Sequence, residues 1–144
     1  MSLVAAIRPD DWNIALFVHL LAAMVLVGAL VLAITAVAAR DLRLGYRALL
    51  FAAIPSWIVM RVSAQWILSE EGLDDADEAP AWVDIGFLTS EPTFLLMIVA
   101  TVCSGIAARR SRTGGGLRTA TLLLVGISLA AYVLAIWAMT TKPS

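Results

Sequence analysis

Four long stretches of the chain are almost entirely apolar, and most charged residues lie in the segments between them. Each stretch reaches the ~20 residues that a helix needs to cross the hydrocarbon core of a bilayer. Because lipid offers no hydrogen-bond partner to the backbone, each stretch is predicted to be helical. We therefore predict an all-α integral membrane protein that forms a single membrane domain over residues 1–144. Its four transmembrane helices are expected at about residues 13–39, 48–68, 88–108 and 117–139.

The composition excludes a soluble domain. Of 144 residues, 61% are hydrophobic and 15% are charged, which is more apolar surface than one soluble core of this size could bury. The net charge of −1 conceals a strong sorting of basic and acidic residues into separate segments. The expected partners are the lipid bilayer and either another membrane protein or a second copy of the chain, and no nucleic acid.

The sorting of charge predicts the orientation. Seven arginines lie in two short connections, residues 40–47 and 109–118, whereas segment 69–91 carries eight acidic residues and no basic one. Because Lys and Arg concentrate in cytoplasmic loops, both Arg-rich connections should be cytoplasmic. The acidic segment 69–91 is then a structured outer loop, and both termini lie outside. The predicted location is the bacterial plasma (inner) membrane.

Small residues at helix-packing intervals indicate how the spans associate. Such residues let helix backbones approach closely in a membrane. Short connections favour antiparallel neighbours, so the spans are predicted to form an up-and-down four-helix bundle. In the fourth span Thr121, Ser128 and Tyr132 share a face that should turn inward. The small residues in question are Ala22, Ala29 and Ala33 in the first span, Thr101 and Gly105 in the third, and Gly126 and Ala130 in the fourth.

A charged residue, Arg61, lies inside the second span. Such a charge costs about 2.5–3.5 kcal/mol on insertion scales and normally finds a partner. At ~1.5 Å per residue, Arg61, Gln65, Glu91, Tyr132 and His19 all fall in the outer third of the ~30 Å core. The sequence therefore predicts a polar cluster in which Arg61 pairs with Glu91, braced by Gln65 and Tyr132. This cluster is either structural or ligand-binding.

The segment "SEPTF" supports the pairing from the side of the third span. Ser90 reads as a helix cap, Glu91 as an acid in the first turn and Pro92 as a residue near the first helical position. The residues before it, "APAWVDIGFLTSEP", are expected to lie on the outer surface or to fold back over the bundle. Glu91 is thereby predicted near the beginning of the third helix.

Three functions are compatible with this cluster. No nucleophile is paired with a base, and no metal triad is evident, which favours a non-enzymatic accessory or partner-binding membrane protein. A second hypothesis is a haem- or copper-handling electron-transfer protein that uses His19, the only histidine. A third is a small transporter or ligand binder in which Arg61 and Tyr132 receive an anionic or quinone-like molecule from the outer leaflet.

Two segments carry a resemblance to a known family. "FVHLLAAMVLVGALVLA" in the first span and "AAIPSWIVMRVSAQWI" in the second resemble small bacterial four-helix membrane proteins related to the copper-resistance-D-type membrane domain. The resemblance implies a membrane bundle concerned with copper or haem. A b-type haem needs two axial ligands, so a methionine or a second copy of His19 would have to supply the other. No cofactor is therefore predicted, with haem b as the alternative.

Overall fold

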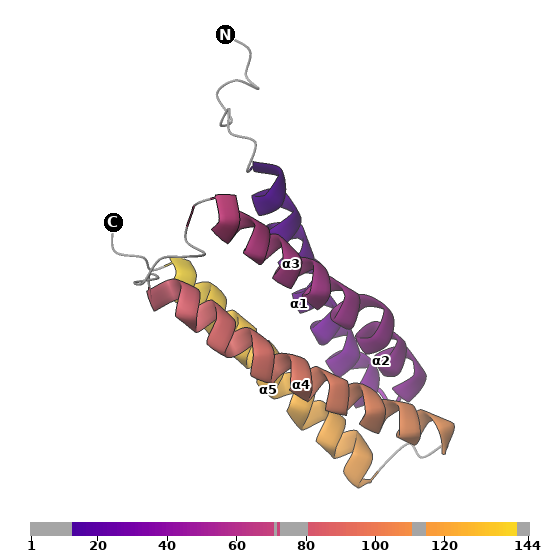
Figure 1. Ribbon diagram of the computed structural model, residues 1–144. Helices are drawn as coiled ribbons and strands as arrows, with labels where there is room; N and C mark the ends of the chain where they lie inside the picture. Colours follow the sequence, from indigo (N-terminus) through magenta and orange to yellow (C-terminus); the bar gives the residue numbers. More distant parts are fainter. Residues whose placement is uncertain (1–12, 71, 73–80, 111–114, 141–144) are drawn as a thin grey trace.

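The computed structural model describes residues 13–70, 72, 81–110 and 115–140, and every regular element in them is helical. Four helical segments among these residues are long and apolar enough to cross a membrane, which confirms the all-helical class and the number of spans predicted. The second of them runs without a break through three elements, α2, η2 and α3 (Figure 1). The elements are α1 (Asn13–Ala38), α2 (Leu42–Ala48), the π-helix η2 (Leu49–Ala53), α3 (Ile54–Glu70), α4 (Ala81–Arg109) and α5 (Gly116–Thr140).

Two predicted helix boundaries are wrong. The connection 40–47 is mostly helical, because Asp41 caps α2 by accepting a 3.0 Å hydrogen bond from the Leu44 N–H. Helix α4 begins at Ala81 rather than near residue 88, so the predicted outer loop 69–91 is shorter than expected. Most of its acidic residues, in 71 and 73–80, lie outside the described residues.

The long segments form a bundle in which successive segments run antiparallel (Figure 1). Helix α1 packs against α3 and α5, and α4 packs most extensively against α5. The second segment meets α4 mainly through α2, whereas α3 itself makes few contacts with α4. We call the end of the bundle that carries α2 the arginine-rich end. It bears Arg40, Arg43, Arg47, Arg109, Arg110 and Arg118.

The core lies along α1, where the predicted small residues are buried. Ala22, Ala29 and Ala33 are buried beside Leu26 and Leu30, which are fully enclosed. These alanines let α1 approach its neighbours closely, as predicted. Leu49, Met97 and Val125 complete this core from the other segments.

The prediction for α5 is partly right. Thr121, Ser128 and Tyr132 are buried on its inward face, as expected. Gly126 has no neighbouring atom within 4 Å of an added Cβ, and Ala130 is exposed, so the small-residue interval on this helix does not mark a packing face. Helix α5 therefore packs through hydroxyl-bearing residues instead.

Two local features shape the backbone, one inside the second segment and one at the end of α1. The π-helix η2 ends just before Pro55, whose ring would clash with the carbonyl of residue 51 in a regular helix. The wider turn, with the Ile54 N–H donating to the Leu49 carbonyl, keeps the helix continuous across that proline. At the arginine-rich end, the Arg118 side chain donates to the carbonyls of Val37 (3.0 Å) and Ala38 (2.9 Å) in the last turn of α1. The Val37 carbonyl also accepts from the Arg40 N–H at 3.1 Å.

The close contact between α2 and α1 predicts the first measurable effect. A Cβ on Gly45 would lie 2.4 Å from Val37 Cγ2, whereas Gly126 has open space. Both Gly45→Ala and Gly126→Ala raise helix propensity by a similar amount, so their difference isolates the clash. We expect Gly45→Ala to be less stable than Gly126→Ala by about 1–3 kcal/mol in thermal unfolding of the detergent-solubilised protein. Equal stability of the two variants would contradict this packing of α2 on α1.

Candidate functional site

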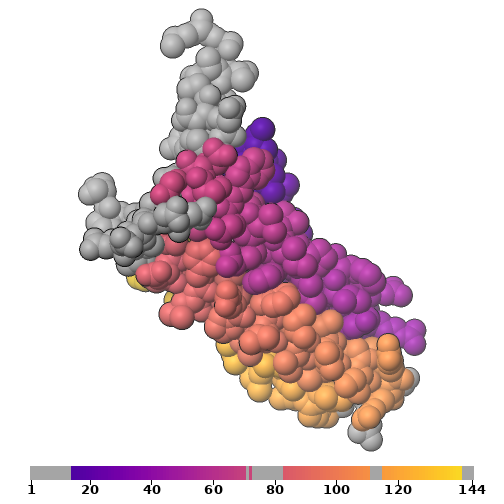
Figure 2. All heavy atoms as spheres, viewed as in Figure 1, coloured from indigo at the N-terminus to yellow at the C-terminus, as the bar shows by residue number. Residues whose placement is uncertain are grey.

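A cavity of about 520 Å³ lies where α3 and α4 make few contacts, on the side of the bundle away from the arginine-rich end. Residues of α1, α3, α4 and α5 line it, and most of them are apolar. On the face shown in Figure 2, side chains of α3 and α4 are in contact with each other. The polar residues of the wall are His19, Arg61, Thr89, Ser90 and Tyr132.

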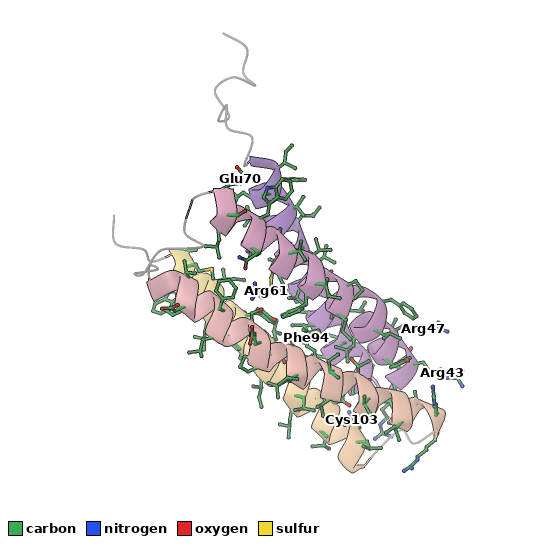
Figure 3. All side chains as sticks on the ribbon, viewed as in Figure 1. Arg43, Arg47, Arg61, Glu70, Phe94 and Cys103 are labelled. Atoms are coloured by element: carbon green, nitrogen blue, oxygen red, sulfur yellow. The ribbon has the colours of Figure 1, made fainter. Side chains whose placement is uncertain are left out.

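Arg61 bridges α3 and α4 beside this cavity (Figure 3). Its Nη2 lies 3.8 Å from Glu91 Oε1, and its Nη1 donates to Gln65 Oε1 at 3.4 Å. The guanidinium carbon also lies 4.1 Å from the centre of the Phe87 ring, a cation–π contact. Glu91 is 70% exposed, compared with 27% for Arg61, so the pair is half open and the arginine is its enclosed member.

A second layer joins the helices closer to the middle of the bundle. Trp57 of α3 stacks on Phe94 of α4, with ring centres 4.0 Å apart, and its indole N–H donates to the Ser90 carbonyl at 3.2 Å. The hydroxyls of Thr93 and Tyr132 are hydrogen-bonded at 2.8 Å and thereby join α4 to α5. These contacts hold the three helices together just below the cavity.

The Ser90 hydroxyl is an unsatisfied group in the cavity wall. Ser90 is 6% exposed, and among the described residues its Oγ has no partner at hydrogen-bond geometry, although Tyr132 lies close enough to interact with it. A buried hydroxyl without a partner costs free energy, so such a group needs an explanation. Its Oγ is closed off from the open space of the cavity, so the neighbouring Tyr132 hydroxyl is the group placed to satisfy it.

His19 is held by the backbone of α3. Its Nδ1 lies 2.9 Å from the Met60 carbonyl and 3.4 Å from Ser63 Oγ. Ser63 Oγ is itself 2.8 Å from the Val59 carbonyl and 3.0 Å from the Met60 carbonyl, to which its single proton can be donated. Contacts on one ring nitrogen therefore orient the imidazole, while the residue lines the cavity.

The five residues of the predicted cluster gather in one region, but not all with the predicted partners. His19, Arg61 and Tyr132 line the same cavity, and Gln65 and Glu91 contact Arg61. Among the described residues, Tyr132 makes its hydrogen bond with Thr93 and none with Arg61 or Glu91. The prediction for "SEPTF" is wrong: Ser90, Glu91 and Pro92 lie within α4, which begins at Ala81.

Sequence reasoning missed several residues of the site. Phe87 belongs to the segment expected to be a loop, and Ser90 was assigned to a helix cap, so neither was expected in a cavity wall. Ser63 carries no motif that singles it out. The one usable signal was spacing, because Trp57 and Arg61 are four residues apart and thus share a helix face.

No metal centre is evident in the part of the chain that the structure describes, where no group of three or more His, Cys, Asp or Glu residues lies together. Met60 and Met139 line the same cavity as His19. The haem alternative stays a prediction. A smaller cavity of about 380 Å³ lies near the arginine-rich end, between Tyr46 and Arg109, and shares no residue with the first.

No protein-family model, curated protein or solved structure was found to match the chain. The resemblance to copper-resistance-D-type membrane proteins therefore stays a prediction.

Proposed function

We propose that this protein is a non-enzymatic, multi-pass membrane protein that binds a small amphiphilic molecule in the cavity between α1, α3, α4 and α5. One observation carries the proposal. An apolar cavity of about 520 Å³ has a few polar side chains in its wall, among them His19 and Arg61. Ligand sites are typically concave, apolar and of ~300–1,000 Å³, with a few polar groups that fix orientation.

The arrangement of helices supports a route for such a molecule. Helices α3 and α4 touch sparsely, and Arg61 with Glu91 and Phe87 forms their polar contact beside the cavity. An amphiphile that diffuses in the bilayer can reach this seam with its apolar part still in lipid. We propose that it passes between α3 and α4, beside the exposed Glu91.

The orientation predicted from the arginines places this cavity in the outer leaflet. The arginine-rich end then faces the cytoplasm, both termini face outward and the membrane is the bacterial plasma membrane. Binding of a partner through the acidic outer loop would add to this function. That role depends on residues 71 and 73–80, which lie outside the described residues.

Filling the cavity should abolish binding. Ala64 lines the cavity and is partly buried, so Ala64→Phe places a phenyl group in the space that the ligand would occupy. Val133→Phe adds a phenyl group at an exposed position of α5 that does not line the cavity and is the matched control. We expect native mass spectra after mild extraction to show a bound small molecule in the wild type and the control, reduced at least about tenfold in Ala64→Phe.

Two outcomes would contradict the proposal. One is a wild-type protein that carries no small molecule after mild extraction and binds none of a panel of membrane lipids and isoprenoids. The other is an Ala64→Phe variant that is folded and retains the same adduct as the control.

A further inference from the structure

We infer that the molecule bound in this cavity is a neutral amphiphile whose head carries a hydroxyl group, and that this hydroxyl donates a hydrogen bond to His19 Nε2. The inference rests on the proposed function and names the class of ligand. Two features of the wall support it: the tautomer of His19 and the compensated charge of Arg61.

The contacts of His19 fix which ring nitrogen carries the proton. A carbonyl oxygen can only accept, so the 2.9 Å contact between Nδ1 and the Met60 carbonyl requires a proton on Nδ1. Ser63 also lies by Nδ1, but backbone carbonyls 2.8 Å and 3.0 Å away accept its proton. In the neutral imidazole Nε2 then carries a lone pair and is a hydrogen-bond acceptor. His19 thus offers the cavity an acceptor, which a ligand with a hydroxyl proton can satisfy.

The surroundings of Arg61 argue against an anionic head. The guanidinium is opposed by the Glu91 carboxylate and contacts Gln65 and the Phe87 ring. The pair is therefore close to neutral as a unit before any ligand binds. An added carboxylate or phosphate would bring a second negative charge toward Glu91 in an apolar region, where charge is costly. A neutral head incurs no such cost.

The cavity wall beyond His19 and Arg61 is mostly apolar. It includes Leu16, Leu20, Val27 and Ile67, which suit a hydrocarbon or aromatic body. Lipid alcohols and phenols share this chemistry.

The test compares each hydroxyl-bearing probe with its methyl ether, in which a methyl group replaces the hydroxyl proton. The full-length protein in nanodiscs is titrated calorimetrically with 4-nonylphenol and its methyl ether, and with 1-dodecanol and its methyl ether, using empty nanodiscs to correct for partitioning. We expect at least one hydroxyl probe to bind about five- to tenfold more tightly than its ether, the gain from one hydrogen bond. The pair with the larger ratio tells whether the source is phenolic or aliphatic.

The variant His19→Leu tests whether His19 causes the difference in affinity between a hydroxyl probe and its ether. In His19→Leu the ratio should fall to within about twofold because the hydroxyl probe loses affinity while its ether does not. If wild-type protein binds each ether as tightly as its hydroxyl probe, the inference is wrong and the proposed function still holds. If no probe binds, and Ala64→Phe changes no native adduct, the proposed function itself fails. A ratio that persists in a folded His19→Leu protein would overturn the assignment to His19.

Discussion

Leu30→Ala is expected to destabilise the bundle by about 2–3 kcal/mol, the low end of the range for such changes in cores. Leu30 is fully enclosed in the core along α1. Lipid tails solvate a leucine about as well as a protein core does, so little transfer free energy is lost. What is lost is the packing around the deleted atoms, because the neighbouring helices cannot collapse into the space.

The matched control lies on the same helix. Leu32 is 45% exposed, and Leu32→Ala should change stability by less than about 0.5 kcal/mol because the removed atoms face lipid. Thermal unfolding in one detergent, or denaturation by increasing fractions of SDS, compares the two variants directly. Two equal losses would mean that α1 does not pack through the face that carries Leu30.

The four spans were predictable from hydrophobicity because a helix that crosses a bilayer must be apolar along the whole part that lies in lipid. The predicted boundaries were wrong at the helix ends, where apolar residues are no longer required. Around Arg43 and Arg47 a helix can continue into the polar boundary, and Asp41 caps it there. Residues from Ala81 continue as helix up to Pro92 and beyond, since a proline within a helix can be tolerated in a membrane bundle. A pattern of charges alone cannot distinguish such extensions from loops.

The sequence predicted some of the residues that gather around the cavity, but not their geometry. Depth along the helices correctly brought His19, Arg61 and Tyr132 to one level. Depth does not specify rotation about the helix axis, which decides that Tyr132 meets Thr93 rather than the ion pair. It also does not show that α3 and α4 make few contacts with each other, because the way that all the helices pack sets those contacts. The cavity is a consequence of tertiary packing.

The half-open geometry of the Arg61–Glu91 pair predicts an asymmetric cost for breaking it. Glu91→Gln leaves the enclosed guanidinium without its counter-charge, and we expect a loss of about 2–3 kcal/mol. Arg61→Met leaves a carboxylate that is 70% exposed and can turn toward the polar boundary, so its loss should stay below about 1 kcal/mol. A symmetric buried bridge would instead make both variants equally unstable. Unfolding in detergent at fixed pH and salt measures each loss.

The double variant completes the cycle. In Arg61→Met with Glu91→Gln the unpaired guanidinium is gone, so the double variant should be more stable than Glu91→Gln alone. Losses that simply add would show that the two side chains do not interact, despite their 3.8 Å separation. A large loss on Arg61→Met would mean that the arginine acts as a structural bolt between α3 and α4. A small loss would mean that the arginine contributes little to stability, although it lines the cavity.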